Sequence, residues 1–152
     1  MMRMTRLTDY GIVLLTYIAR HPERITRNAR DLAAEARLPL PTVSKVLKIL
    51  VRNGLLAAQR GVNGGFRLAR PPKKITMDEI ITALEGPLAL TECNGRHPGG
   101  CNLERLCPVG SNWQRMNRAV RDTLGKITLS DMTKPIPQTF AALPRQNNRA
   151  EV

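Results

Sequence analysis

The sequence predicts a mainly α-helical fold with one small β-hairpin. Apolar residues recur at helical spacing in three stretches, near residues 5–20, 41–53 and 111–126. Two short extended segments flank an Asn-Gly turn at residues 63–64, which is typical of a hairpin. The length of 152 residues fits one domain with a small appendage. Because only 3% of the residues are aromatic, aliphatic side chains must fill its core.

The composition favours a cytoplasmic protein whose partner is an acidic polymer. No apolar run approaches the ~18 residues that a membrane helix needs. Charges are interleaved at the start of the sequence, which argues against a secretory signal. The net charge is +12, and residues 1–70 carry 13 basic and 4 acidic side chains. Such a basic half favours nucleic acid, with general solubility or an acidic membrane surface as the alternatives.

The first two helices are predicted from one apolar face and from one cap. The apolar face of residues 5–20 consists of Tyr10, Val13, Leu14, Tyr17 and Ile18. A short second helix follows Asn28, which can cap it, and Asp31 in its first turn meets the positive end of the helix dipole. A turn at residues 38–41 ends it.

The third helix is predicted over residues 41–53. Pro41 suits its first position, and Gly54 supplies a left-handed stop. Its buried stripe is Val43, Val46, Leu47, Leu50 and Val51, and its outer face carries Thr42, Ser44, Lys45, Lys48 and Arg52. Two short helices joined by a tight turn, the second with a polar and basic outer face, describe a helix-turn-helix.

A basic hairpin follows this helix directly. Residues 55–60 and 66–69 are the predicted strands, and Arg60, Arg67 and Arg70 decorate them. A hairpin in this position is the wing of a winged helix. An ordinary helical bundle, which is the alternative for residues 27–53 alone, has no need of such a wing.

The second half is predicted to contain two more helices around a loop. Thr76 and Glu79 form a capping box that opens a helix over 77–85. The Gly/Pro-rich loop 88–110 holds all three cysteines. In helix 111–126 the seam Trp113, Met116, Val120 and Leu124 suits packing between subunits, although an intramolecular core face has the same periodicity.

These elements divide the chain into three parts. Residues 1–72 form the winged helix-turn-helix DNA-binding domain, and residues 73–132 form a helix, the cysteine loop and a long C-terminal dimerisation helix. Residues 133–152, with Pro135 and Pro137 near the start and a polar end, are predicted to be a disordered tail.

The DNA contacts are predicted from the position of the third helix, which would enter the major groove. Thr42, Ser44 and Lys45 lie at its N-terminal end, where base edges are normally reached. Phosphate contacts are predicted for Lys48, Arg52, Arg27 and Arg30. For any single basic residue, a solvated surface charge is the alternative interpretation.

Several strings in the chain resemble the winged-helix iron–sulfur regulators of the IscR, NsrR and RirA type, over about residues 2–132. The strongest are Arg60-Gly61-x-x-Gly64-Gly65-Phe66-x-Leu68, Leu40-Pro41-Thr42-Val43-Ser44-Lys45-Val46-Leu47 and Ile80-Ile81-x-Ala83-Leu84-Glu85-Gly86. The strings Leu88-Ala89-Leu90-Thr91-Glu92-Cys93, Asn112-Trp113 and Leu129-Ser130-Asp131-Met132 further resemble the branch that regulates the SUF cluster-assembly operon. The resemblance implies a homodimer on an inverted repeat, and it implies a DNA contact for Arg60.

The three cysteines, Cys93, Cys101 and Cys107, are candidate metal ligands. Thiolates bind zinc, iron–sulfur clusters or copper(I). Structural zinc usually has shorter Cys-x2–4-Cys spacings, although His97 could complete a Cys3His site. Inert or redox thiols are a further alternative. The resemblance favours an iron–sulfur cluster held by the three cysteines, and [2Fe-2S] over [4Fe-4S].

The fourth cluster ligand stays open. IscR-type chains place a His three residues after the last Cys, whereas this chain has Gly110. Asp9 matches the position from which NsrR-type chains donate a carboxylate across the dimer, and it could equally be a residue that stabilises the start of a helix. His97, Glu92 and Glu104 are local alternatives.

The sequence thus predicts a DNA-binding transcription regulator, a repressor by its SUF resemblance, whose operator affinity responds to the cluster. A zinc-stabilised DNA binder and a nitric-oxide or iron sensor of the same family are the alternatives. A small redox or metal enzyme is disfavoured, because His21 and His97 are the only histidines and no second catalytic constellation accompanies the cysteines.

Overall fold

The computed structural model describes residues 4–91, 94, 101 and 106–135. Its elements follow one another as α1 (Arg6–Arg20), α2 (Ala29–Ala36), α3 (Leu40–Arg52), β1 (Leu56–Gln59), β2 (Gly65–Leu68), the 3-10 helix η1 (Pro72–Lys74), α4 (Met77–Glu85), α5 (Gly110–Lys126) and α6 (Leu129–Met132). This confirms the mainly helical fold with one antiparallel hairpin. The predicted tail lies outside the described residues from 136 onward.

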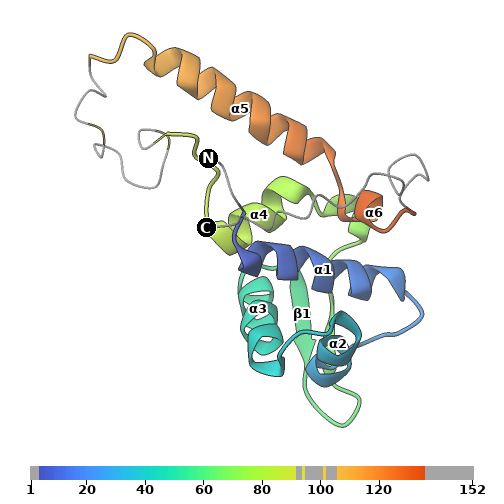
Figure 1. The fold of residues 1–152 in the computed structure, drawn as a ribbon. Coiled ribbons are helices and arrows are strands. Elements are labelled where there is room, and N and C mark those ends of the chain that lie inside the picture. Colours follow the sequence, from blue (N-terminus) through green and yellow to red (C-terminus); the bar gives the residue numbers. More distant parts are fainter. Residues whose placement is uncertain (1–3, 92–93, 95–100, 102–105, 136–152) are drawn as a thin grey trace, which may run out of the picture.

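The helices are arranged around α1 (Figure 1). On one side of α1 lie α2, α3 and the hairpin, and on the other lies α4. The long helix α5 packs on α4 and extends away from this body, and α6 returns beside α1. Among the described helices, none is both long and apolar enough to cross a membrane.

The helix-turn-helix is built as its local sequence predicts. Asn28 caps α2, because its side chain accepts a 2.8 Å hydrogen bond from the amide of Asp31. Arg37 ends α2 in the left-handed conformation, with φ 53°. The buried residues of α3 are Val43, Val46, Leu47 and Leu50. After α3, Gly54 takes φ 71°, which confirms the left-handed stop.

The hairpin is tied to the segment that precedes α2. Leu56 pairs with Leu68 and Gln59 with Gly65. Arg27 adds an isolated antiparallel bridge to Phe66, with backbone hydrogen bonds of 2.9 Å and 2.8 Å between them. The hairpin is therefore held against the body rather than projecting freely. A one-residue bridge has no periodicity, so the sequence pattern did not predict it.

The core continues past residue 72. Ile75, Met77, Ile80 and Leu129 are buried in the same cluster as residues of α1 and α3 such as Leu14. The predicted capping box of α4 is present, since Glu79 Oε2 accepts from the Thr76 amide at 2.9 Å. A second capping box, Thr128 with Asp131, starts α6, which was not predicted as a helix.

Helix α5 differs from every other long helix, because it has no buried residue. In the predicted seam, Trp113, Val120 and Leu124 are half-buried, whereas Met116 is 47% exposed. The apolar seam is therefore only partly covered by its own chain: Leu124 packs against the core, and Met116 is left exposed.

Candidate nucleic-acid interface and cysteine segment

The outer face of α3 presents a line of basic side chains. Lys45, Lys48 and Arg52 are exposed, and their spacing of three and four residues places them on one side of the helix. Thr42 and Ser44 are half-buried at the edges of this face. The structure thus brings the predicted base-reading and phosphate-holding residues of α3 onto one surface.

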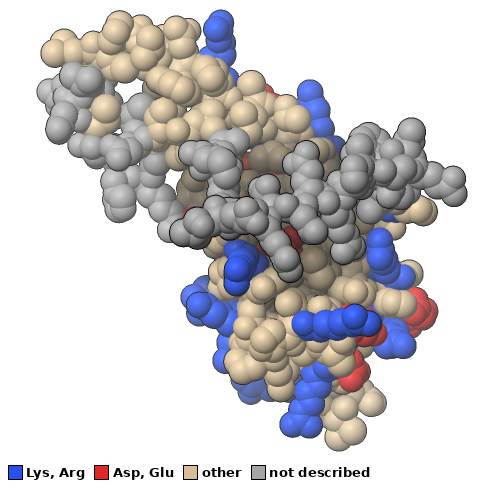
Figure 2. All heavy atoms as spheres, viewed as in Figure 1, with Lys and Arg blue, Asp and Glu red and all other residues tan. Residues whose placement is uncertain are grey.

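The charge of this surface is not balanced locally. From Ala36 to Met77 the chain holds nine Lys or Arg residues and no Asp or Glu. In the view of Figure 2, Lys and Arg outnumber Asp and Glu on the end of the molecule formed by α2, α3 and the hairpin. A surface with such an excess of positive charge attracts a polyanion and would make its binding sensitive to salt.

The hairpin adds Arg60 and Arg67, both exposed. Two glycines allow its close docking on the body. A Cβ on Gly64 would come within 2.5 Å of the carbonyl oxygen of Gln59, and one on Gly65 within 2.7 Å of the carbonyl oxygen of Arg27. The Gly-Gly pair of the sequence motif is therefore required by backbone packing.

The predicted phosphate contact of Arg27 is wrong, because its side chain is only 1% exposed. Its Nη2 lies 2.5 Å from Glu35 Oε1 on α2. The hydrogen bond from this guanidinium lowers the pKa of Glu35. Arg27 thus joins α2 to the hairpin from the inside, and its Nε and Nη1 have no hydrogen-bond partner among the described residues. Arg30, in contrast, is exposed on α2.

The cysteine segment, which we define as residues 86–109 between α4 and α5, is described in part. Cys101 and Cys107 are free thiols and half-buried, whereas Cys93 lies outside the described residues. Cys107 directly precedes α5, and its carbonyl accepts a 3.3 Å hydrogen bond from the amide of Gly110. A Cβ on Gly110 would lie 3.7 Å from the Cβ and 4.0 Å from the Sγ of Cys107, which is ordinary van der Waals contact, so this position lies directly beside the thiol.

The candidate fourth ligands are not brought to these thiols within the described part of the chain. Asp9 is exposed in the first turn of α1, beside a hollow of about 350 Å³ that Ile12, Tyr17 and Met132 also line. His97, Glu92 and Glu104 lie outside the described residues. No group of three His, Cys, Asp or Glu side chains placed to hold a metal ion occurs among the residues described.

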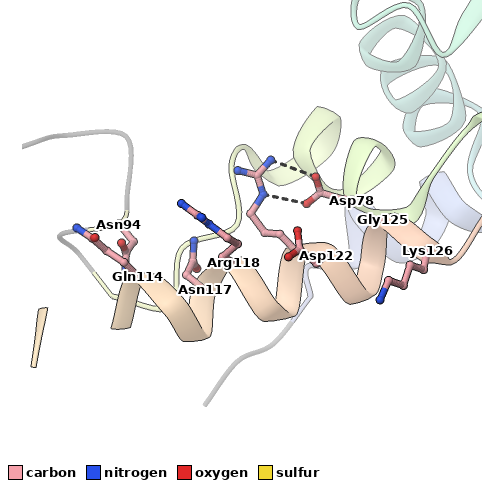
Figure 3. A pocket seen from close by; sticks show the side chains of 9 residues that line it. Asp78, Asn94, Gln114, Asn117, Arg118, Asp122, Gly125 and Lys126 are labelled. Carbon is pink, nitrogen blue, oxygen red and sulfur yellow. Dashed lines mark hydrogen bonds and ion pairs between the residues drawn. The ribbon is translucent and has the colours of Figure 1, made fainter. Parts of the chain in front are cut away.

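Two polar contacts that the sequence analysis missed attach α5 to its surroundings (Figure 3). Arg121 donates to both carboxylate oxygens of Asp78 on α4, at 3.3 Å and 3.1 Å. Asn117 hydrogen-bonds the backbone of the segment that leads to Cys93. Both residues line a polar hollow of about 720 Å³ along α5. No local motif marks them, because their partners are 27 to 43 residues away.

A third missed contact links α4 to α1. Glu85, the last residue of α4, accepts hydrogen bonds from the Thr5 amide at 2.7 Å and from the Thr8 hydroxyl at 2.6 Å. The bond from Thr8 and the bonds from Thr5 lower the pKa of Glu85. The start of α1, which carries Asp9, is therefore fixed to the point where the cysteine segment begins.

Comparison with known proteins shows what this chain is similar to. A family model described as Rrf2, iron-dependent transcriptional regulator, matches residues 4–135. The HTH-type transcriptional regulator NsrR of Shouchella clausii is 30% identical over 131 residues, which cover 86% of this chain and 88% of that protein.

Solved structures share the fold. The structure of CymR, the global cysteine regulator of B. subtilis, superposes with a TM-score of 0.69 at 24% identity and covers 88% of this chain and 97% of CymR. IscR of T. potens superposes with a TM-score of 0.65 at 23% identity, covering 91% of this chain and 96% of IscR.

Proposed function

Because this chain belongs to the Rrf2 family of transcriptional regulators, we propose that it binds an inverted-repeat operator as a homodimer and that its affinity depends on an iron–sulfur cluster held by Cys93, Cys101 and Cys107. Like its relatives, which are transcriptional regulators, it is a regulator and not an enzyme. The observation that carries the DNA-binding part is the carboxylate-free basic surface of α3 and the hairpin.

The proposed DNA contact of each residue follows from its exposure and its position in the fold. Lys45, with Thr42 and Ser44 beside it, is near the N-terminus of α3, the part of a recognition helix that meets base edges. Lys48, Arg52 and Arg30 are exposed and serve the phosphates. Arg60 extends the contact from the wing. Arg27 contributes by fixing the wing to α2.

The homodimer is supported by the apolar surface that α5 leaves open. Met116, Ala119 and Val120 lie on one side of a helix without buried residues. A shallow apolar hollow, lined by Ala119, Val120, Thr123 and Leu124, runs along it. Packing this face against a second copy would remove it from water and set the spacing of the two α3 helices on an inverted repeat.

The donor chemistry of the cysteine segment fits a cluster. The two described cysteines, Cys101 and Cys107, are free thiols. Cys107 lies just before α5, and no side chain caps the first amides of that helix. These amides favour the negative charge of thiolate ligands. When bound, the cluster would supply a redox- and iron-sensitive charge, and Asp9 of the partner subunit, His97, Glu92 or Glu104 would be the fourth ligand.

The coupling to DNA runs through the protein's own contacts. The cysteine segment begins at the Glu85 end of α4, which is bonded to α1, and it ends at α5, which sets the dimer. Ordering of the segment would therefore bias the separation of the two recognition helices, which is a population shift. We propose cluster-assembly genes as the targets and repression as the mode, from the resemblance to the SUF branch.

Two other interpretations are compatible with the same architecture: a nitric-oxide or iron sensor of the same family, and a zinc-stabilised DNA binder. NsrR is similar to this chain in sequence, and CymR, a cysteine regulator, is similar in fold. A zinc ion on the cysteines would give a DNA binder without redox sensing. The zinc alternative differs from the cluster in the bound metal, so one preparation separates these two.

That preparation is anaerobic purification followed by an absorption spectrum and by iron, sulfide and zinc analysis. We expect a coloured protein with visible absorption and matching iron and sulfide. A colourless protein that contains zinc would support the zinc alternative. A colourless protein without metal, which stays so after iron and sulfide are supplied, would contradict the cluster.

A further inference from the structure

Asn117 makes two hydrogen bonds of opposite sense to one short stretch of backbone. Its Oδ1 accepts from the amide of Leu90 at 3.1 Å, and its Nδ2 donates to the carbonyl of Leu88 at 3.1 Å. The side chain is half-buried in the middle of α5. The backbone that receives this pair of bonds, at Leu88 and Leu90, ends three positions before Cys93 in the sequence.

Both ends of the cysteine segment are therefore attached to the same helix. The far end joins α5 through Cys107 and Gly110. The near end is attached at Asn117, seven residues further on, which is about 10 Å along the helix axis. The position of α5 and the path of the segment cannot change independently while these bonds persist.

The contact has unusual weight because α5 has so few others. Helix α5 has no buried residue. Among the described residues, it is positioned by half-buried side chains and by two polar side-chain contacts to other elements, those of Asn117 and the Arg121–Asp78 pair. Arg121 and Asn117 are four residues apart and share one face of the helix, but they contact different elements. Arg121 contacts α4, whereas Asn117 contacts the described backbone that leads to Cys93.

We propose that Asn117 is the positioning residue that couples the cysteine segment to α5, and through α5 to the spacing of the recognition helices. The proposal rests on the proposed function, because it explains how the state of the cysteine segment reaches the dimer. A carboxamide is required, since only it offers one donor and one acceptor in one plane to the Leu88 carbonyl and the Leu90 amide.

Three variants separate the parts of this contact. Asn117→Leu has a similar size and removes both hydrogen bonds. Asn117→Asp keeps the acceptor for Leu90 but loses the donor to Leu88, and therefore measures partial rescue. Gln114→Leu is the matched control, because Gln114 is exposed on the same helix and makes no hydrogen bond to the described residues.

The first measurement is amide hydrogen exchange in the cluster-free protein. We expect the Leu90 amide to exchange at least about tenfold faster in Asn117→Leu than in the parent, as loss of one net hydrogen bond implies. In Gln114→Leu it should exchange at the parent rate. Equal Leu90 exchange in Asn117→Leu and the parent would overturn the contact itself, whether or not a cluster exists.

The second measurement is the ratio of operator affinities with and without cluster. We expect Asn117→Leu to bind its cluster with the parent's visible spectrum and to retain the parent's helix content. Its operator affinity should differ much less between the cluster-bound and the cluster-free form than the parent's affinity does. Asn117→Asp should keep an intermediate ratio and Gln114→Leu the full one. An unchanged ratio in Asn117→Leu would overturn the coupling role. If the parent itself binds the operator equally well with and without cluster, the proposed function is overturned. The hydrogen-exchange result then still decides whether Asn117 holds the segment.

Discussion

The body of the molecule, α1 to α4 with the hairpin, and the helix α5 are held in place by different forces. In the body, aliphatic side chains from α1, α3, α4 and α6 are fully buried together. In α5 no residue is buried, and its attachment depends on Asn117, Arg121 and a half-buried apolar seam. The body is therefore held together mainly by buried apolar contacts, whereas α5 is held by half-buried side chains and by polar contacts at its surface.

The largest expected effect of a single substitution is in the core of the body. Leu47→Ala removes a fully buried side chain of α3 and should lower the free energy of unfolding by about 2–5 kcal/mol. Val120→Ala on α5 should cost less than half as much, because its side chain is only half-buried in the chain. Denaturant unfolding of both variants at one protein concentration makes the comparison. Equal losses would show that α5 is part of the core.

A charge on the α5 seam should separate the subunits without unfolding the body. Val120→Glu would place an unpaired carboxylate in the proposed dimer interface and should weaken dimerisation by at least about tenfold, which is 1.4 kcal/mol. Light scattering over a range of concentrations measures this, with circular dichroism to check the fold. Asp122→Asn, on the opposite side of α5, is the control. A Val120→Glu protein that remains a dimer at the parent's concentrations would exclude this seam as the interface.

Neutralising the basic surface should affect DNA binding while leaving stability almost unchanged. Lys45→Ala and Arg60→Ala should each weaken operator binding by about 1–3 kcal/mol. Arg115→Ala, which removes an exposed charge from α5, should have little effect. Gel-shift titrations at two salt concentrations measure the loss. Unchanged affinity in both Lys45→Ala and Arg60→Ala would refute the placement of α3 and the wing on DNA.

The smallest expected effect concerns the bond between α4 and α1. The hydrogen bond from Thr8 lowers the pKa of Glu85 in the folded protein. In the unfolded chain the pKa of a Glu side chain is about 4.3. Its stabilising contribution is thus present above that pH and is lost as the pH falls through the lower pKa of the folded state. Glu85→Gln should be less stable than the parent by under about 1 kcal/mol at pH 7, because the site is exposed.

At pH 3 this difference between Glu85→Gln and the parent should become smaller. Thermal unfolding at both values, with Asp122→Asn as the control for loss of a surface charge, provides the measurement. A difference that grows on acidification would have the wrong sign for a carboxylate stabilised by folding.

Local sequence signals predicted the body well. The predicted helix 41–53 became Leu40–Arg52, and the capping box at Thr76 and the stop at Gly54 are both present. These features depend on neighbouring residues, so a pattern can reveal them. The direction of the exposed face of α3 also follows from its apolar stripe.

Features that depend on distant partners were not predictable in this way. Arg27 looks like a surface cation in sequence, and its burial follows only from Glu35 and the bridge to Phe66. Asn117 is one more polar residue on an amphipathic helix until its bonds to Leu88 and Leu90 are known. One signal was available but unused: the carboxylate-free stretch from Ala36 to Met77 outlines the basic surface directly.

The central claim is that the basic body binds DNA and that the cysteine segment adjusts how tightly. Its most direct test is the operator affinity of the anaerobically purified protein, compared with Cys107→Ala under the same conditions. We predict that Cys107→Ala folds with the parent's helix content but differs from the parent in operator affinity by about tenfold or more, a coupling of the usual allosteric size. Equal affinity of a metal-loaded parent and of Cys107→Ala would contradict the account.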